Sequence, residues 1–464
     1  MSSNNSIYRF ATLSVILLIG IFVRAVLWWS WNGQPIQIDD AKDYHDFAVR
    51  LVETGSYINP TGELSSMRPP LYPWVLSLIY RLFGVDNDGA VRGFQAIVSL
   101  FTVLFVYRIG VRIYSEAVGL LAAGITCFYP SLLGFNNLIL SETLFTFLVV
   151  VSTWFFVEAI YQQSVLMILF AAAVLGLATL TRSITMLSIP FFAFLILTTW
   201  RCGWGRRIAT TLVFVASFSL VIAPWSYRNT RIQKAFTLID VMGGRNAMMG
   251  NYEYTPLERS WATITLVTGE KSWDAVLRRE HPEVKGMTQG QLDKVALKHG
   301  LHFVFTHPVL TAQRTMVRFF NFWQLERTLV AGAQQKLWGE VSKQRLVIMA
   351  IVICGSYAVV IFLAMFGLIL VPPVDRRYGW LLVTSVAIPC LVHTAIFAHE
   401  RYRLPSMPLI ILFASAACVN YREIWSCRRE WTFKLAAMGC VVLILGWVRE
   451  VCFADLSLAS QIFP

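Results

Sequence analysis

Long apolar runs separated by short polar stretches dominate the pattern along the chain. A helix needs about 20 apolar residues to cross the hydrocarbon core of a bilayer. The runs that approach this length lie at 9–31, 89–112, 117–135, 142–161, 164–181, 184–200, 207–226, 346–370, 378–398, 405–420 and 431–448. The pattern therefore predicts an all-α integral membrane protein, a multi-span helical bundle with about eleven spans.

Two segments, residues 32–88 and residues 227–345, are too polar and too long to be simple connections. In the first, apolar residues recur at helical spacing from Asp40 to Val52, and Gly55 follows in the position of a helix C-cap. A second apolar helix comes after it and is too short to span the bilayer. Both helices are expected to lie along the membrane surface.

The longer segment, residues 227–345, carries mixed charge and several helix-like stretches, including 291–305. Unstructured loops of this length are uncommon, so the segment is predicted to form a small domain. The chain then divides into a transmembrane module at 1–226, which includes the first polar segment, the domain at 227–345, and a second transmembrane module at 346–464.

Composition agrees with a membrane protein and excludes other classes of protein. Hydrophobic residues make up 56% of the 464 residues and charged residues 14%, and the mean hydropathy is +0.59. Soluble domains carry about 25% charged residues, so a soluble enzyme and a disordered chain are both excluded. The eight cysteines form no CxxC pair and indicate neither a disulfide framework nor a zinc site.

The net charge is +12, but the basic residues are spread between the apolar runs rather than gathered into a tail. This distribution indicates membrane topology and no nucleic-acid partner. The short loops on one side of the membrane hold more arginines than those on the other side, among them Arg201, Arg206 and Arg207. The positive-inside rule then places the N-terminus in the cytoplasm, and the segments 32–88 and 227–345 outside.

Two adjacent carboxylates, Asp39 and Asp40, begin the first surface helix. They could cap the helix by accepting hydrogen bonds from its free backbone N–H groups. Alternatively, one of them is a general base whose pKa is raised by the nearby lipid. Asp43 and Asp46, about one turn further on, are expected to face water.

Several arginines fall at the ends of spans and surface helices on the outer side. They are Arg68, Arg182, Arg228, Arg401 and Arg403, with His399 beside the last two. A single arginine at this level can simply reach the lipid headgroups. Five of them facing an acidic loop instead indicate a site for a membrane-anchored phosphate, which guanidinium groups bind through paired hydrogen bonds. Glu142 opens a span, where the helix dipole favours a carboxylate.

Familiar motifs of soluble hydrolases are absent from the sequence, which has no P-loop, no GxSxG elbow and no HExxH pair. Nucleotide hydrolysis and the corresponding protease and esterase chemistries lose support. His299, His302 and His307 do not share one helical face. No cofactor is therefore expected, and a divalent metal is compatible with the sequence but not indicated by it.

Six short segments, taken in order, resemble one family of membrane enzymes. They are residues 39–44 (Asp-Asp-Ala-Lys-Asp-Tyr), 68–73 (Arg-Pro-Pro-Leu-Tyr-Pro), 141–145 (Ser-Glu-Thr-Leu-Phe), 176–182 (Gly-Leu-Ala-Thr-Leu-Thr-Arg), 224–229 (Pro-Trp-Ser-Tyr-Arg-Asn) and 400–405 (Glu-Arg-Tyr-Arg-Leu-Pro). The chain is similar in these segments to the GT-C glycosyltransferases of family 39 and related groups, which include protein O-mannosyltransferases and lipid A aminoarabinose transferases.

The resemblance implies transfer of a sugar from a polyprenyl-phosphate carrier to an acceptor hydroxyl, at the outer face of a bacterial inner membrane. The acceptor would be a glycan, a lipid or a protein. Asp40, with Asp39 beside it, matches the aspartate proposed as general base, and direct displacement would invert the anomeric centre. The implied positions near the donor phosphate are Arg68, Arg182, Arg401, Arg403 and His399, and the supporting positions are Glu142, Tyr44 and Arg228.

Two other functions stay open at this stage. A flippase or transporter of lipid-linked saccharides would place ionisable groups near the middle of the bilayer, whereas here they gather at the outer rim. A polysaccharide polymerase or ligase would also act outside, but it would use a lipid-diphosphate donor. The type of donor therefore distinguishes the preferred function from this alternative.

Overall fold

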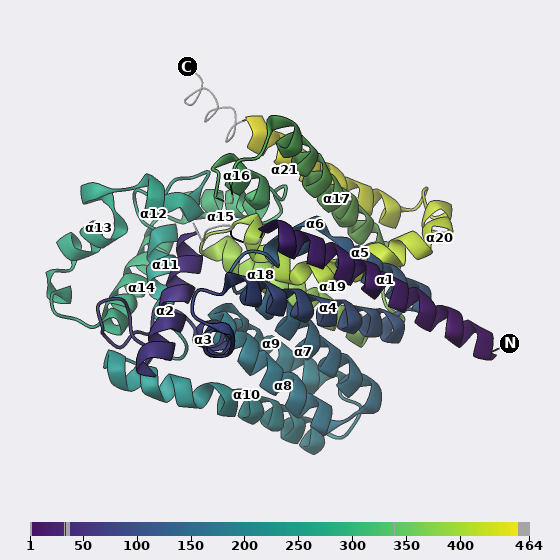
Figure 1. Ribbon diagram of the computed structural model, residues 1–464, viewed down its shortest axis with the longest axis horizontal. Coiled ribbons are helices and arrows are strands. Elements are labelled where there is room, and N and C mark those ends of the chain that lie inside the picture. Colours follow the sequence, from purple (N-terminus) through teal and green to yellow (C-terminus); the bar gives the residue numbers. More distant parts are fainter. Residues whose placement is uncertain (1, 32, 34–37, 338, 453–464) are drawn as a thin grey trace.

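The computed structural model describes residues 2–31, 33, 38–337 and 339–452, and these residues are organised as helices joined by turns (Figure 1). Extended pairing within them is limited to isolated bridges such as the one between Ile58 and Leu64. The predicted all-α membrane bundle is confirmed.

Eight helical segments among the described residues are long and apolar enough to cross a membrane, and each coincides with a predicted run. They are Phe10–Trp31 within α1 (Ser2–Trp31), α4 (Asp88–Ile113), α7 (Glu142–Gln162), α10 (Trp204–Gln233), α17 (Lys343–Leu370), α18 (Arg376–Ala395), the 3₁₀ helix η5 (Glu400–Ser406) with α19 (Met407–Val419), and α21 (Trp431–Glu450). α20 (Tyr421–Ser426) connects the last two of these.

The three remaining predicted spans are shorter helices, so the count of eleven spans is not confirmed. They are α5 (Glu116–Phe128), α8 (Val165–Thr181), and the 3₁₀ helix η1 (Ser183–Ser188) continued by α9 (Ile189–Thr199). The run at 117–135 is broken because Tyr129 has an extended backbone before Pro130, which starts the short helix α6 (Pro130–Phe135). A residue before proline avoids the helical region, and the proline itself is well suited to a first turn.

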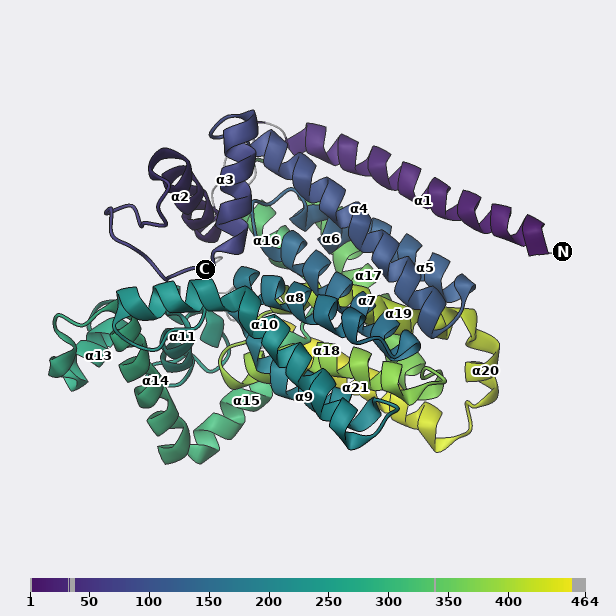
Figure 2. The ribbon, with the colours of Figure 1, turned by 90° about the horizontal axis from the view of Figure 1, so that it is seen from below.

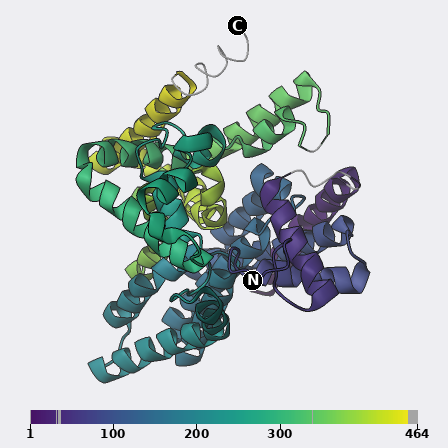
Figure 3. The same cartoon turned by 90° about the vertical axis from the view of Figure 1, so that its left-hand side faces the viewer.

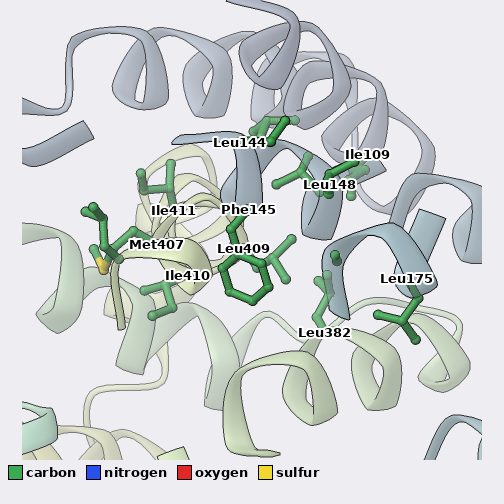
Figure 4. Packing of buried hydrophobic residues seen from close by; sticks show 14 of the residues in the cluster. Ile109, Leu144, Phe145, Leu148, Leu175, Leu382, Met407, Leu409, Ile410 and Ile411 are labelled. Atoms are coloured by element: carbon green, nitrogen blue, oxygen red, sulfur yellow. The ribbon is translucent and has the colours of Figure 1, made fainter. Parts of the chain in front are cut away.

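The core of the bundle includes two closely packed pairs of helices, α17 with α19 and α7 with α8, and α7 also packs against α4. Phe145 of α7 lies beside Leu409 of α19, and Leu148 of α7 lies beside Ile109 of α4 (Figure 4). Helices at the rim, such as α1 and α21, instead expose most of their apolar side chains. This distribution is expected for a bundle whose outer surface faces lipid.

The two helices predicted in residues 32–88 are confirmed as α2 (Asp39–Thr54) and α3 (Leu71–Phe83), which pack against each other, and their position along the membrane surface stays a prediction. Gly55 ends α2 with a positive φ of 68°, and its N–H donates to the carbonyl of Leu51. Glycine adopts this left-handed conformation at little cost, which explains the sharp end of the helix. α3 has 13 residues and is too short to span a bilayer, as expected.

The segment 227–345 contains six short or medium helices in its described part. They are α11 (Gly243–Gly250), α12 (Thr263–Leu266), α13 (Trp273–Glu280), α14 (Gln289–Thr306), α15 (Pro308–Phe322) and α16 (Thr328–Gln334), together with the 3₁₀ turns η2 (Ser260–Ala262), η3 (Gly269–Lys271) and η4 (Pro282–Val284). α14 confirms the helix expected at 291–305. The segment has a small core of its own around Met248, Tyr252 and Leu277. The division of the chain into three modules stays a prediction.

Helices α11 to α14 lie at the same end of the bundle as α2 and α3, and Figures 2 and 3 show the two groups side by side. α10 connects them, because it continues past Pro224 to Gln233 and carries Asn229, which bonds Ser66. The two long polar segments of the sequence therefore meet over one end of the bundle.

Candidate active site

A continuous chain of alternating charges lies at the end of the bundle where the two polar segments meet. Its members, in order of contact, are Asp43, Arg68, Asp40, Arg401, Glu142 and Arg182. Three carboxylates alternate with three guanidinium groups, so the chain carries no net formal charge. Four of the six members were predicted from the sequence, one as the general base and three as residues that bind the donor phosphate.

Arg68 joins the two carboxylates of α2. Its Nη2 donates to Oδ1 of Asp40 at 2.7 Å and to Oδ2 of Asp43 at 2.6 Å, and its Nε donates to the same Asp43 oxygen at 3.1 Å. The guanidinium also lies 5.5 Å from the ring centre of Tyr44. Arg68 is therefore held in one orientation at the edge of the site.

Arg401 links the surface helix to the membrane bundle. Its Nη1 lies 3.0 Å from Oδ2 of Asp40, and its Nε donates to Oε1 of Glu142. Nη1 of Arg182 lies 2.9 Å from the same oxygen of Glu142. Glu142 is fully buried, so two arginines share one desolvated carboxylate. Such a carboxylate fixes both guanidinium groups in place.

Each charged side chain is placed by the end of a helix. Asp40 is in the first turn of α2, and Glu142 is the first residue of α7. Arg182 is the C-cap of α8, and Arg401 lies in η5, which leads directly into α19. Arg68 precedes two prolines, and these keep the chain extended until α3 begins. Five elements that are remote in sequence therefore converge on one small volume.

The arginines determine the protonation of Asp40. Burial disfavours its charged form, but Arg401 and Arg68 outweigh this effect and hold the pKa of the Asp40 carboxyl well below its usual range. Burial alone would lower the pKa of Arg68, yet Asp40 and its neighbours raise it. The expectation that lipid raises the pKa of this aspartate is therefore wrong for the structure without substrate, because two cations face it.

Asp39 is separate from the chain of charges, and its side chain is fully exposed. Its nearest basic partner is Lys42, at 3.7 Å. The alternative role in capping is not supported either, since Ile38 is the N-cap of α2 and no side chain caps it. Tyr44 is buried behind the site, where its hydroxyl lies 3.2 Å from Oγ of Ser141, next to Glu142.

Arg403 does not share the site, which corrects the prediction that it binds the donor phosphate. Its side chain is completely buried, and its Nη1 donates to the carbonyl of Phe322. Its Nη2 lies 3.2 Å from the carbonyl of Gln324 and 3.5 Å from Oε1 of Glu326. Alternate residues in this 3₁₀ turn point in different directions, so Arg401 reaches the site while Arg403 ties η5 to the end of α15.

Two other predicted residues flank the site without joining the chain of charges. Nδ1 of His399 lies 2.9 Å from Oε2 of Glu400 and 3.2 Å from the backbone nitrogen of Arg401, so His399 fixes the turn that carries this arginine. Arg228 donates to the carbonyls of Ser65 and Tyr57, each at 2.9 Å. It therefore anchors the loop before α3 to α10, which is a supporting role at a distance.

Three residues near the site were missed by the sequence analysis. Asp43 was expected to face water, and its side chain is 43% exposed, but its contact with Arg68 was not predicted. Burial raises the pKa of Asp240, which follows α10 and feels the charge of Arg68. Burial and then Arg68 lower the pKa of Arg245, whose guanidinium lies 4.8 Å from the ring of Trp273. Only the fold could reveal these neighbours, since all three lie in ordinary polar stretches.

An apolar pocket opens beside Arg182, between α7, α8, α9, α18 and η5. Its cavity volume is about 40 Å³. Phe145, Phe156 and Leu175 supply much of its lining, and His393 and Tyr402 lie at its polar end with Arg182. An apolar pocket with a few convergent polar groups is the usual form of a binding site for an amphipathic ligand.

Among the residues that the structure describes, no group of three histidine, cysteine, aspartate or glutamate side chains is placed to hold a metal ion. The carboxylates of the site are instead engaged by arginines. Whether the protein uses a divalent metal stays a prediction from the sequence.

Comparison with known proteins gives both sequence and fold matches. Residues 67–227 match the family model described as dolichyl-phosphate-mannose-protein mannosyltransferase. An uncharacterized protein of Aquifex aeolicus is 26% identical over 169 residues, which are 36% of this chain and 34% of that protein. The undecaprenyl phosphate-alpha-4-amino-4-deoxy-L-arabinose arabinosyl transferase of Pseudomonas savastanoi pv. phaseolicola is 25% identical over 222 residues, 46% of this chain and 40% of that protein.

The fold match extends over almost the whole chain. The oligosaccharyltransferase AglB of Archaeoglobus fulgidus, solved with an inhibitory peptide and a dolichol-phosphate, superposes with a TM-score of 0.56 at 14% identity. The match covers 96% of this chain and 55% of AglB. The matched parts of the curated relatives amount to less than half of their lengths. The expected resemblance to GT-C proteins of the family 39 type is confirmed.

Proposed function

We propose that this GT-C membrane protein, similar to family 39, is a glycosyltransferase that moves a sugar from a polyprenyl-phosphate carrier to an acceptor hydroxyl. The observation that carries the proposal is the chain of three arginines and three carboxylates, whose last member, Arg182, lines an apolar pocket. Paired guanidinium groups suit a phosphate, and the pocket suits the first isoprene units behind it.

The donor phosphate binds at Arg182 and Arg401 in this proposal. These arginines share the buried carboxylate of Glu142, which keeps them fixed and leaves part of each guanidinium free for a ligand. The first isoprene units of the carrier lie against the apolar lining formed by Phe145 and Leu175, and the pocket widens from its volume of about 40 Å³ to admit them. As the bond to the sugar breaks, negative charge builds on the phosphate, and preorganised cations stabilise it.

Asp40 is the proposed base for the acceptor hydroxyl. Without donor it is paired to Arg68 and Arg401, which makes it a weak base. A bound phosphate competes with Asp40 for Arg401, so donor binding raises the basicity of Asp40. Asp40 takes the hydroxyl proton as the acceptor oxygen attacks the anomeric carbon, and the carrier leaves as a phosphate. One direct displacement of this kind inverts the anomeric centre.

The proposed site faces the extracytoplasmic side of a bacterial inner membrane, with the N-terminus in the cytoplasm. The distribution of arginines in the short loops supports this orientation. The acceptor, a glycan, a lipid or a protein, then approaches between the segments 32–88 and 227–345. A site at the rim of the bundle also favours a transferase over a flippase, whose ionisable groups would lie along a path through the bilayer.

A test of the proposal uses the purified protein in phospholipid vesicles with two synthetic donors. One donor carries its labelled sugar on polyprenyl monophosphate and the other carries the same sugar on polyprenyl diphosphate. We expect release of free polyprenyl phosphate and transfer of label from the monophosphate donor. Transfer from the diphosphate donor alone would instead assign the protein to the polymerase or ligase class. Movement of the donor from one leaflet of the vesicle membrane to the other, without bond cleavage, would identify a flippase.

A further inference from the structure

The corner between α14 and α15 exposes large apolar side chains. Figure 2 shows the two helices as the arms of a V, with Thr306 and Pro308 at the ends that meet. Phe305 is 80% exposed, Val309 72% and Met316 63%. Contiguous exposed apolar surface of this kind marks a site of contact with a partner or a membrane.

The polarity of α15 is the reverse of that of a helix lying in water. Its two arginines, Arg314 and Arg318, point inward and are buried. Arg314 donates to the carbonyls of Tyr252 and Thr255 at 3.0 and 2.8 Å. A surface helix normally turns its charged residues outward and its apolar stripe inward. This inversion indicates that the medium outside α15 is itself apolar.

The outward stripe of α15 has helical spacing and contains no charged residue. It comprises Val309, Ala312, Gln313, Met316 and Phe319, which are all exposed. Since these positions are three or four residues apart, they form one continuous face. The face extends onto the end of α14 through Phe305.

α15 also packs against membrane helices at the ends that border the site. The ring of Phe320 lies so close to Gly446 of α21 that a β-carbon there would meet it at 2.4 Å. Thr394, at the end of α18, lines an open groove together with Met316. One turn earlier, Leu391 of α18 is 64% exposed. The apolar surface of the spans therefore continues onto α15.

We propose that the corner of α14 and α15 is inserted into the membrane surface on the side of the site, where lipid acyl chains occupy the groove beside α18. The reversed polarity of α15 and its continuity with the spans both favour lipid over a protein partner. Interfacial helices bury their apolar face about 5–10 Å into the boundary between headgroups and acyl chains. The proposal does not depend on the transferase activity.

Site-specific photo-cross-linking tests the proposal on the full-length protein. The photoreactive residue benzoyl-phenylalanine replaces Phe305 or Met316, and the protein is reconstituted in phosphatidylethanolamine and phosphatidylglycerol vesicles whose acyl chains carry an alkyne tag. The matched control places the same residue at Arg279 of α13, whose side chain is 53% exposed. We expect lipid adducts at positions 305 and 316 to exceed those at 279 by at least about tenfold, because only inserted positions contact acyl chains.

Equal lipid labelling at all three positions would overturn the proposal, since the corner would then lie in water. Protein adducts at 305 and 316, formed in place of lipid adducts, would also overturn it and would identify the face as a protein interface. Both replaced side chains are exposed, and Phe305 is replaced by a phenylalanine derivative, so folding should be preserved. Unfolding temperatures of the three labelled proteins provide the check on folding.

Discussion

At the scale of single residues, the site is defined by which cations and carboxylates share a partner. Arg401 and Arg403 are two positions apart in one 3₁₀ turn, yet one contacts Asp40 and the other is buried against Glu326. Asp39 and Asp40 are adjacent, yet only Asp40 contacts arginines at hydrogen-bonding distance. These two pairs supply matched variants for testing the roles proposed above.

The first prediction concerns the base. Asp40→Asn keeps the size of the side chain but removes its basicity, and turnover should fall by about 10²–10⁴-fold, the usual contribution of a general base. Asp39→Asn is the matched control on the same helix turn and should keep near-normal turnover, since its carboxylate is fully exposed. Initial rates in vesicles with the monophosphate donor measure both. Comparable losses in the two variants, or none in Asp40→Asn, would remove Asp40 from the proposed role.

The second prediction separates binding of the phosphate from stability. Arg401→Lys keeps the charge but loses the planar fork, so we expect weaker donor binding and slower turnover with little change in unfolding temperature. Arg403→Lys should instead lower the free energy of unfolding by about 1–3 kcal/mol, because buried carbonyl groups lose their donors. Donor titrations and thermal unfolding in detergent distinguish the two outcomes. If Arg403→Lys weakened donor binding in a normally stable protein, the corrected assignment of Arg403 would fail.

The third prediction concerns pH. In the free protein Arg401 and Arg68 hold the pKa of Asp40 below its usual range, so acid protonates it only at low pH. Once a phosphate engages Arg401, the pKa of Asp40 should rise. The acid limb of kcat, which reports the substrate complex, should then lie at higher pH than the acid limb of kcat/KM, which reports the free protein. Coincident acid limbs, or the reverse order, would contradict competition between phosphate and Asp40 for Arg401.

At the scale of elements, the sequence predicted helices well and their contacts poorly. The apolar runs located α4, α7 and α21 to within a few residues, because length and hydropathy are local properties. The partner of Asp43 could not be predicted, since Arg68 reaches it only when α2 packs beside the loop before α3. The break at Pro130 was also missed, because the surrounding run is apolar on both sides.

The fourth prediction tests helix packing at a glycine. A β-carbon on Gly367 of α17 would meet the carbonyl oxygen of Phe413 on α19 at 1.9 Å. Gly367→Ala should therefore destabilise the bundle, by about 1–3 kcal/mol for an overpacked core. Gly355→Ala on the same helix meets nothing within 4 Å and should be neutral or stabilising, because glycine weakens a helix interior by about 0.5–1 kcal/mol. Thermal unfolding of the two variants measures the difference, and equal midpoints would mean that α17 and α19 are further apart.

At the scale of the whole molecule, the segment 227–345 covers the end of the bundle where Asp40 lies. Arg245 brings a cation from this segment toward Arg68, and Asp240 brings a carboxylate. A bound phosphate would alter the balance among these charges. The segment is therefore well placed to respond to the donor and to contact the acceptor, as substrate-responsive lids commonly do.

The last prediction joins this response to the orientation of the chain. Amide hydrogen exchange in α11 and α14 should slow when a donor analogue and an acceptor are added, while exchange in the spans changes little, because substrate-responsive lids belong to the less stable parts of a structure.

For orientation, Glu283→Cys should react with a membrane-impermeant reagent on intact cells, since this side chain is 59% exposed. Arg206→Cys, in the first turn of α10 at the other end of the bundle, should react only after permeabilisation. The reverse labelling pattern would place the site in the cytoplasm and remove polyprenyl carriers on the outer face from the proposed reaction. If hydrogen exchange is unchanged when both ligands are added, the segment 227–345 does not respond to the substrates and has no part in the proposed reaction.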